Sequence, residues 1–585
     1  MRFTNRQWQL APPAPPDSAR EFPELHPVLV GLVVRRGLTT QAAVDEFLHP
    51  DWSQDVHDPF RFREMERVVE RLIAAVERKE LIVVYGDYDA DGVCASATLA
   101  ETFRALGARW DVYIPYRHTE GYGLHLNAIE AIAKRGAKVI VTVDCGSSNV
   151  VEIARAAELG LDLIVTDHHH EPPERPQPYA LINPWFTGET YPFQGLSAAG
   201  VAFKVVQALL QKTAYGRTFG RELPEGWEKW LLDLVTISTI ADMVPLLGEN
   251  RTLVSYGLTV LRKTRRLGLH ALIRTARKQV ERLTAEDVAF VIGPRINSAG
   301  RLNHASTAFR LLMSTEETEA AALSDDLTST NTERQKLTKL VYDASRQQIG
   351  EQPAGPVVFA GDAAWSPGLL GLVAGKLVQH YGKPAFVFGS LNGETVASGR
   401  SIESLNIIET LAEVRSLLSR YGGHEQACGF TLKSRAGRTA FERQVSRVVA
   451  RRLKGIDARP SLVIDAVLAI EDVTWELVER LEVLEPYGVG NRKPRFLARG
   501  VVVTAIERVG GDLQHLKLAV TGGDHIVRKM IGFTFGEHGE RLTVGDTIDV
   551  VYEVGVHEWN GNREIELKMI DARHSHEDET PDPLQ

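Results

Sequence analysis

The segment "LIVVYGDYDADGVCASA" (81–97) sets an apolar, β-branched run directly before three aspartates at alternating positions, Asp87, Asp89 and Asp91. Alternating acids followed by glycine also open an EF-hand calcium loop, which requires a bidentate glutamate at its twelfth position. The twelfth position counted from Asp87 is Thr98, and the run before the acids has the pattern of a strand rather than of an amphipathic helix. We therefore expect the three acids at the carboxyl end of a strand, where open α/β sheets bind their ligands.

Two later strand-like runs end in the same kind of residue. "VIVTVDCGSSN" carries Asp144, and "LIVTDHHH" carries Asp167, His168, His169 and His170. A single acid at a strand end could cap the following helix, and a histidine run could be a polar loop. When neighbouring parallel strands all end in such residues, a divalent cation is the simpler explanation, because converging carboxylates repel one another without one.

The residue types also indicate which cation is bound and which reaction follows. Ligation by Asp and His without cysteine favours Mn²⁺ or Mg²⁺ over structural zinc, and the ligands suffice for two ions. Two ions about 3.5–4 Å apart clamp the attacking and leaving oxygens of a phosphoryl displacement. The pattern thus predicts a phosphoester hydrolase.

The elements that must position these residues alternate between strand and helix. Such alternation implies right-handed βαβ crossovers and a mostly parallel sheet with helices on both faces. The expected strands cover 81–86, 110–114, 138–144 and 161–167, and the expected helices cover 93–106, 124–135 and 148–159.

Other patterns flank this α/β region. Residues 35–50 predict a short amphipathic helix, and a Ser314/Glu317 capping box opens one long helix over 314–350, or two helices broken near Thr328–Thr330. A second α/β unit follows, and short strands near the end predict a small β-barrel, specifically an OB-fold. We expect an N-terminal segment with short helices (1–70), a catalytic domain (71–315), a connecting helix (316–350), a second α/β domain (351–458), an OB-fold domain (459–575) and an acidic, disordered tail (576–585).

The bulk composition is that of an ordinary globular protein. The 585 residues carry a formal charge of −9 from 67 basic and 76 acidic side chains, which argues against a general nucleic-acid coat protein. Basic residues are grouped in 261–282 and 433–459, although either group could be a solvated helix face. The three cysteines fit neither a disulfide framework nor a zinc module. With no apolar run of about 18 residues and no leader pattern, we expect a cytoplasmic protein without membrane segments.

Four motifs occur in a specific order along the chain. "GDYDADG", "VTVDCG", "TDHHH" and "STIADMVPL" resemble those of the DHH phosphoesterase superfamily, and "SGRSI" with "RYGGHEQACGF" resembles its associated second domain. "LHPVLVGLVVRRGLTTQAAVDEFL", "IPYRHTEGYGL", "GPRINSAGRL" and "LEPYGVGNRKPRF" are similar to segments of the superfamily's bacterial exonucleases specific for single-stranded DNA. The resemblance covers about residues 25 to 570.

The resemblance implies a set of metal ligands for two Mn²⁺ or Mg²⁺ ions, with Asp144 placed to bridge them. His169 matches a position close to the scissile phosphate, so Asp144 and His169 are the implied catalytic residues. Tyr85 stands where pyrophosphate-hydrolysing members have a histidine, so we expect water or substrate to complete one ion's coordination. Asp87 is interpreted as an acid that contacts the metal indirectly or caps the following helix. The implied ligands are Asp89, Asp91, Asp144, His168 and Asp242.

The resemblance also implies a pocket for a terminal 5′-phosphate, formed by Arg117, Ser398 and Arg400. His424 is an implied phosphate or sugar contact. "WSPG" (365–368) departs from the pattern of the exonucleases specific for single-stranded DNA, which have a tryptophan, a histidine and an acid before this glycine. Weaker candidates for DNA contact are Arg295, Arg301 and, on the barrel, Trp559 beside Arg492, Lys493 and Arg495, although Trp559 could equally be a barrel-core residue.

These roles together imply a two-metal exonuclease that removes 5′-mononucleotides from the 5′ end of single-stranded DNA in repair and recombination. The implied partners are single-stranded DNA, a single-strand-binding protein and a RecQ-like helicase, and we expect a monomer. A DHH oligoribonuclease or cyclic-dinucleotide phosphodiesterase remains an alternative, as does a non-catalytic replication scaffold. Intact metal ligands argue against the scaffold, and the barrel argues against the shorter phosphodiesterases.

Overall fold

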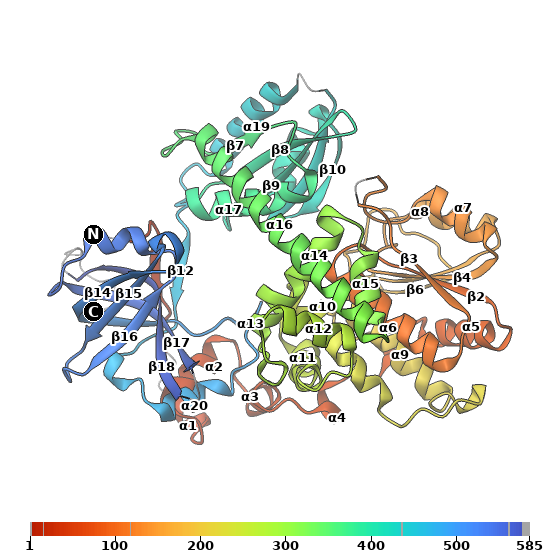
Figure 1. The fold of residues 1–585 in the computed structure, drawn as a ribbon, viewed down its shortest axis with the longest axis horizontal. Coiled ribbons are helices and arrows are strands. Elements are labelled where there is room, and N and C mark those ends of the chain that lie inside the picture. The colour runs from red at the N-terminus through yellow and green to blue at the C-terminus, as the bar shows by residue number, and fades with distance from the viewer. Residues whose placement is uncertain are drawn as a thin grey trace. The chain divides into compact units, whose positions relative to one another are not determined.

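The computed structural model describes residues 3–13, 15, 17–117, 119–434, 437–559 and 562–575. The chain packs into two compact units (Figure 1). One contains Pro50–Ile456 and Pro486–Gly490, and the other contains Met1–His49, Asp457–Glu485 and Asn491–Gln585. Among the described residues, no helix is long and apolar enough to cross a membrane. The expected acidic tail, 576–585, lies outside the described residues.

The larger unit begins with a parallel five-stranded sheet in the order β3-β2-β4-β5-β6. Every residue of β2 is buried because helices cover both faces, as Figure 1 shows. The predicted parallel α/β sheet is thus confirmed, and β6 adds a strand that the sequence patterns did not indicate. The strands are β2 (Leu81–Tyr85), β3 (Trp110–Tyr113), β4 (Ala137–Val143), β5 (Asp162–Thr166) and β6 (Ala180–Ile182). The covering helices are α5 (Met65–Glu77), α6 (Ala90–Leu106) and α9 (Ala198–Lys212) on one face, and α7 (Leu126–Lys134) and α8 (Val150–Glu158) on the other.

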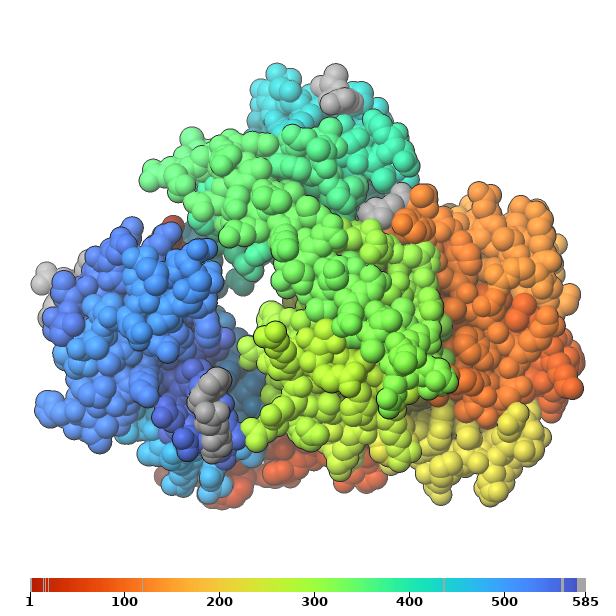
Figure 2. Space-filling model, in the orientation of Figure 1, coloured from red at the N-terminus to blue at the C-terminus, as the bar shows by residue number. Residues whose placement is uncertain are grey.

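A helical layer packs against α6 and α9. It leads into α16 (Glu317–Ile349), a single helix of 33 residues whose outer side is visible as a green ridge in Figure 2. The long connecting helix is confirmed, and the alternative with a break near Thr328–Thr330 is excluded. The helices of this layer are α10 (Leu232–Ala241), α11 (Gly248–Leu261), α12 (Leu267–Thr275), α14 (Gly293–Leu302) and α15 (Ser306–Met313).

The predicted capping box of this long helix is wrong. The helix begins after Glu316, and no side chain caps it. Ser314 instead ends α15, and its Oγ donates to the Glu316 carbonyl (3.1 Å) and to Glu319 (3.3 Å). Packing of α16 on α12 and α14 provides the stability that a cap would otherwise supply.

The second α/β part of this unit has a mixed five-stranded sheet in the order β10-β11-β9-β8-β7. Only β7 and β8 run parallel, and the other neighbours are antiparallel. The strands are β7 (Val358–Gly361), β8 (Ala385–Leu391), β9 (Glu394–Arg400), β10 (Leu418–His424) and β11 (Ala427–Leu432), and the flanking helices are α17 (Pro367–Tyr381) and α19 (Arg438–Arg452).

The smaller unit contains a barrel. Its strands follow the order β14-β15-β16-β18-β17, and β17 pairs back with β14 to close it, which confirms the predicted OB-fold. The closed sheet removes exposed strand edges. The strands are β14 (Phe496–Val509), β15 (His515–Thr521), β16 (Val527–Gly532), β17 (Thr547–Trp559) and β18 (Asn562–His574).

The N-terminal residues contribute to this smaller unit. The strand β1 (Gln7–Leu10) pairs in parallel with β12 (Ser461–Ile464), a partner more than four hundred residues away in the chain. The helix expected over 35–50 is shorter, as α3 (Gln41–Leu48), and is preceded by α2 (Pro27–Arg35), which the sequence analysis did not anticipate.

Candidate metal centre

The acids and histidines at strand ends lie at one edge of the parallel sheet. Asp87 follows β2, Asp144 follows β4 and Asp167 follows β5, and these strands are neighbours in the sheet. Asp242 joins them from a different element, as the residue that ends α10. Residues spread over more than 150 positions of the sequence therefore meet at a single place.

His168 contacts three of these carboxylates. Its Nε2 lies 3.1 Å from Oδ1 of Asp144, 3.4 Å from Oδ2 of Asp91 and 3.7 Å from Oδ2 of Asp242. The structure brings all the predicted metal ligands together, and Asp144 and His168 each belong to two of the ligand groups. The groups whose ligand atoms lie within 4.8 Å of one another are Asp144, His168 and His169; Asp91, His168 and Asp242; and Asp87, Asp89 and Asp144.

Backbone amides at two helix starts fix Asp89 and Asp91. Oδ1 of Asp89 caps α6 by accepting hydrogen bonds from the amides of Asp91 (2.9 Å) and Gly92 (3.1 Å). The carboxylate of Asp91 accepts from the amides of Ala198 (3.0 Å) and Ala199 (3.1 Å) at the start of α9. Helix amino ends carry partial positive charge, so they hold both carboxylates in place.

Tight turns deliver the acids to this edge. A Cβ at Gly92 would lie 2.7 Å from the backbone N and O of Asp87, so the turn has no room for a larger residue. Asp144 has φ +62° and Met243, directly after Asp242, has φ +61°. Side chains other than glycine reach this left-handed region at a cost of about 1 kcal/mol or more, and such strain concentrates at functional sites.

Burial and mutual repulsion raise the pKa values of four acids. Burial is the largest cause for Asp87, Asp91, Asp144 and Asp242, and neighbouring carboxylates add to the rise for each of them. Oδ1 of Asp87 is buried without a hydrogen-bond partner among the described residues. A set of buried, repelling carboxylates with an imidazole is a donor set that fits a divalent cation, because the cation offsets both the repulsion and the lost hydration.

His169 pairs most closely with a different acid, Asp167, although its ring also lies near Asp144. Its Nδ1 lies 2.8 Å from Oδ1 of Asp167 and 4.0 Å from Oδ1 of Asp144. Burial by itself would lower the pKa of His169, but the charge of Asp167 outweighs burial and raises it to about 9. Burial likewise opposes ionisation of Asp167, yet His169 and the amide of Ser147 (3.0 Å) bring the pKa of this carboxyl below its ordinary value. The Asp167 carboxylate therefore favours the protonated form of this imidazole.

Two further histidines, His170 and His424, lie beside the candidate metal ligands. His170 is exposed, with its ring centroid 4.2 Å from that of Trp185 and 6.2 Å from that of His424. His424 comes from the end of β10, and burial together with the nearby His168, His169 and His170 lowers its pKa. The second α/β part thus contributes a residue that faces the histidine run.

The predicted 5′-phosphate residues belong to a cluster of guanidinium groups. Arg400 donates to Oγ of Ser398 (3.1 Å), and Arg117 lies over the ring of Tyr88 at 4.7 Å. Burial lowers the pKa of Arg301 to about 10, and repulsion from Arg117, Arg334 and Arg400 adds to the fall. We call these four residues, Arg117, Arg301, Arg334 and Arg400, the arginine cluster.

The sequence analysis missed Arg334, which lies on α16. Its Nε is buried and makes no hydrogen bond within the described part of the chain, and burial lowers the pKa of its guanidinium. Nothing in its local sequence distinguishes it from other polar residues of a long helix. Asn297 was missed as well, although its Oδ1 accepts from the amide of Ala90 (2.8 Å) and so supports the turn that carries Asp89.

The other candidates for DNA contact lie apart from these groups or are already paired. Arg295 donates to the carbonyl of Val291 (2.8 Å) within α14 and the π-helix before it. The backbone of Trp559 ends β17, but its side chain lies outside the described residues. Arg492 forms an ion pair with Asp465 (2.8 Å) and Arg495 one with Glu553 (3.2 Å), so both stabilise the smaller unit.

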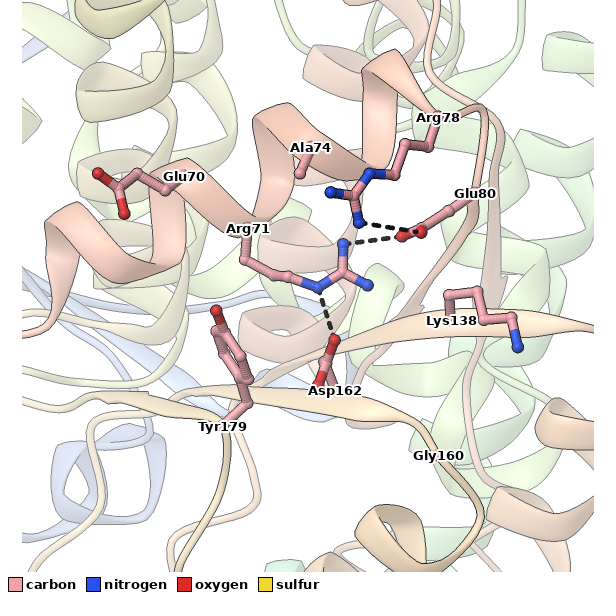
Figure 3. Close-up of a pocket in the computed structure, with 9 residues that line it drawn as sticks. All are labelled: Glu70, Arg71, Ala74, Arg78, Glu80, Lys138, Gly160, Asp162 and Tyr179. Atoms are coloured by element: carbon pink, nitrogen blue, oxygen red, sulfur yellow. Dashed lines mark hydrogen bonds and ion pairs between the residues drawn. The ribbon is translucent and has the colours of Figure 1, made fainter.

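A hollow of about 480 Å³ lies at the opposite, amino-terminal edge of the same sheet. Figure 3 shows Arg71 reaching from α5 between two acids, Glu80 (2.8 Å) and Asp162 (2.6 Å). Because both acids pair with the guanidinium of Arg71, we interpret these residues as a structural contact between α5 and the sheet rather than as a binding site. Its lining is Glu70, Arg71, Ala74, Arg78, Glu80, Lys138, Gly160, Asp162 and Tyr179.

Comparison with known proteins gives matches over nearly the whole chain. Three family models match: the DHH family, N-terminal domain, over residues 81–239, the DHHA1 domain over 354–452 and the RecJ OB domain over 464–571. The single-stranded-DNA-specific exonuclease RecJ of Bacillus subtilis is 36% identical over 577 residues, which cover 98% of this chain and 71% of that protein.

Two solved structures of RecJ from Thermus thermophilus are similar as well. The complex with Mn²⁺ has a TM-score of 0.83 at 28% identity and covers 97% of this chain and 80% of that one. The complex with Mg²⁺ has a TM-score of 0.76 at 26% identity and covers 97% of this chain and 78% of that one.

Proposed function

Because the chain belongs to the RecJ family of DHH phosphoesterases, we propose that it is a divalent-metal-dependent exonuclease that degrades single-stranded DNA from the 5′ end and releases 5′-mononucleotides. The observation that carries this proposal is the position of His168, within 3.1–3.7 Å of three carboxylates from separate elements. The chemistry is assigned to residues 71–315 and 351–458, and strand binding to 459–575.

Two Mn²⁺ or Mg²⁺ ions are assigned to Asp89, Asp91, Asp144, His168 and Asp242. Buried carboxylates with raised pKa values fit such ions, and relatives in the family have structures with Mn²⁺ and with Mg²⁺. When bound, the ions supply a nucleophile at neutral pH and stabilise the charge that develops on the phosphate. The chain's own contribution is to hold Asp89 and Asp91 through helix-start amides and to direct Asp144 and Asp242 through strained turns.

His169 is assigned to the scissile phosphate. Its pairing with Asp167 keeps the imidazole protonated at neutral pH, so it can donate to a phosphate oxygen and oppose negative charge. The hydroxyl of Tyr122 lies 3.2 Å from Nδ1 of His169 and donates to the carbonyl of Asp144 (3.1 Å), which ties the two residues together.

The arginine cluster supports the polarity of the reaction. Arg117, Arg301, Arg334 and Arg400 come from four separate segments, burial opposes the charge of Arg301, Arg334 and Arg400, and the other three arginines add repulsion at Arg301, so an anion would stabilise the group. A terminal phosphate carries more charge than an internal one and is the anion that this group would bind best. A terminal phosphate held at a fixed place relative to the metals limits each cut to one nucleotide.

The cellular role follows from this activity. We assign the protein to DNA repair and recombination in the cytoplasm, acting as a monomer on strands supplied by a RecQ-like helicase and covered by a single-strand-binding protein. These assignments rest on the proposed activity, because unwinding is what exposes a single strand to a 5′ exonuclease.

The test is digestion of DNA labelled at either terminus, with Mn²⁺ present or chelated. We expect mononucleotide release from the 5′ label of single strands, no digestion of blunt duplexes, and no activity without metal. Release that begins at the 3′ label would contradict the polarity. Hydrolysis of dinucleotides alone would instead assign the chain to the oligoribonuclease-like phosphodiesterases, and a failure to cut any substrate would favour a scaffold.

A further inference from the structure

His170, the third member of the histidine run, has no part in the ligand groups described above. It is exposed, and its ring lies against Trp185, with 4.2 Å between the ring centroids and 52° between the planes. Among the described residues, the imidazole of His170 has no hydrogen-bond or ion-pair partner. Its ring nitrogens are therefore available to a ligand, while the indole fixes where the ring lies.

Two polar side chains hold the loops that carry these two rings. Asn183, which follows β6 and is fully buried, accepts from the amide of Trp185 (3.0 Å) and donates to the carbonyl of the residue before His170 (2.8 Å). Glu171, the residue after His170, accepts from the amide (2.8 Å) and the hydroxyl (2.7 Å) of Thr187. The two loops are thus tied together on either side of the rings, so His170 is presented in a fixed position.

A second imidazole faces His170 from the other α/β part of the larger unit. The ring centroid of His424, which is also exposed, lies 6.2 Å from that of His170. Burial and the nearby histidines lower the pKa of His424, and no carboxylate of the described residues opposes them. Because an N–H···O hydrogen bond spans about 2.7–3.2 Å between its heavy atoms, two rings at this separation can both donate to one phosphate group.

The strand order of both sheets separates these histidines from the arginine cluster. In the parallel sheet, Arg117 comes after the edge strand β3, and Trp185, which holds His170, comes after the opposite edge strand β6. The strands between them are followed by candidate metal ligands. In the mixed sheet, His424 and Arg400 pair with the same residue of β11 from its two sides, so two strand spacings, about 10 Å, separate them. A DNA strand that starts at the arginine cluster and crosses the metals would therefore reach the two histidines next.

We propose that His170 and His424 together bind the second phosphodiester linkage from the 5′ end, on the 3′ side of the linkage that is cut. The proposal rests on the proposed function for its ligand, and it gives a role to His170, to which the resemblance assigns none. Each imidazole donates one N–H to a non-bridging oxygen of this linkage. Trp185 is a positioning residue, because it touches the His170 ring rather than the DNA. After each cut this linkage is the next to be hydrolysed, so the contact keeps the remaining strand in line with the metals.

The experiment measures equilibrium binding by the full chain with divalent metal chelated, so that the DNA stays intact. Fluorescence anisotropy compares three 5′-phosphorylated hexanucleotides labelled at the 3′ end. One has natural linkages only, one has a neutral methylphosphonate at the second linkage, and one has it at the fourth. The proteins are the wild type, His170→Ala, Trp185→Ala, Trp185→Phe and His270→Ala. His270 is a matched control because it is an exposed histidine on α12, away from the strand ends that carry the candidate ligands. The melting temperature of each variant verifies the fold.

We expect His170→Ala to weaken binding of the natural strand about tenfold, the effect of losing one hydrogen bond to a charged group. The loss should be equal on the fourth-linkage analogue and absent on the second-linkage analogue, because that strand has already lost its charge at the contact. Trp185→Ala should show a smaller loss with the same dependence on the second linkage, whereas Trp185→Phe and His270→Ala should retain wild-type affinity. Unchanged binding of the natural strand by His170→Ala, an equal loss on all three strands, or a loss that disappears on the fourth-linkage analogue would overturn the proposal.

A separate readout keeps this result distinct from the proposed function. Hydrolysis of the natural hexanucleotide by the wild type with Mn²⁺ tests the nuclease itself. If the wild type does not cut this strand, the proposed function fails, and the anisotropy measurements still decide whether the two histidines bind the linkage. A wild type that cuts the strand but binds the second-linkage analogue as tightly as the natural strand would overturn the role of the histidines alone.

Discussion

His169 Nδ1 lies 2.8 Å from Oδ1 of Asp167, whereas His168 directs its Nε2 to Asp144 at 3.1 Å. Two consecutive histidines on one turn therefore contact different acids. His168 contacts Asp144, which is a candidate metal ligand, and His169 contacts Asp167, which is not. The turn therefore directs one imidazole to the candidate ligands and pairs the next with Asp167, whose lowered pKa favours the charged form of His169.

Asp167→Asn should shift the alkaline limb of the pH–activity profile to lower pH. The pKa of His169 is raised to about 9 in the folded protein. Its positive charge therefore contributes full stability at pH values below the pKa of histidine in the unfolded chain, and this contribution is lost as the pH rises through about 9. Without the Asp167 carboxylate, burial lowers the pKa of His169 and only the smaller raising effects of Asp242 and Asp91 oppose it. Rates measured from pH 6 to 10 check the shift, and identical limbs in the two proteins would contradict the role of the pair.

Asp144→Asn should abolish hydrolysis and stabilise the metal-free protein. The pKa of Asp144 is raised in the folded protein. This acid therefore destabilises the fold at pH values above its pKa in the unfolded chain, and the loss of stability is largest once the pH exceeds its pKa in the folded protein. Asparagine removes the repulsion and also tolerates φ +62° better than aspartate. At neutral pH we expect the free energy of unfolding of the metal-free protein to rise.

Thermal unfolding with and without Mn²⁺ measures this effect. The wild type should gain stability on adding Mn²⁺, and Asp144→Asn should gain little. An active Asp144→Asn enzyme would refute the bridging role, and a variant less stable than the metal-free wild type would refute the account of repulsion.

Much of this site could be predicted from sequence because its residues follow strands. Asp89, Asp144 and His168 sit where an apolar run stops, and the topology of a parallel sheet then brings them to one edge. Asp242 ends a helix and has no such signal, so only the resemblance to a family identified it. Arg334 is one polar residue in a helix of 33, and its partners come from distant segments.

The errors in the fold have the same origin. The capping box at Ser314 is a local pattern. In the structure the Ser314 hydroxyl donates to the carbonyl of Glu316 in the turn before α16 and does not cap the helix. The strand β1 has a partner more than four hundred residues away, which no local pattern can reveal. Local sequence thus predicted elements well, and it failed where a distant segment decides the outcome.

Arg334→Gln should weaken binding of 5′-phosphorylated strands more than it lowers kcat. Its buried guanidinium adds charge to the arginine cluster, so its loss should raise KM about tenfold, the effect of one charge-assisted phosphate contact. Arg400→Ala should act in the same way, and both should reduce the preference for phosphorylated over hydroxyl 5′ ends. Lys339→Gln, an exposed position of α16, is the control. Equal losses on the two kinds of end would argue against a terminal-phosphate site.

Lys204→Met tests what holds α9 against α11. The Lys204 ammonium is fully buried, is ion-paired with the equally buried Glu249, and donates to the carbonyl of His57 (2.9 Å). The same carboxylate accepts from the hydroxyl of Tyr191 (2.6 Å). Removing the cation leaves an uncompensated buried charge, so we expect a loss of about 3–5 kcal/mol in the free energy of unfolding.

Two further variants separate this cause from simple loss of packing. Lys204→Met combined with Glu249→Gln removes both charges and keeps an oxygen for Tyr191, so it should recover most of the lost stability. Lys212 lies on the same helix as Lys204, and Lys212→Met breaks only an exposed pair with Glu66 of α5, so it should change stability very little. Denaturant unfolding of the three variants measures the differences, and a double variant no more stable than Lys204→Met would show that packing, rather than an unpaired charge, explains the loss.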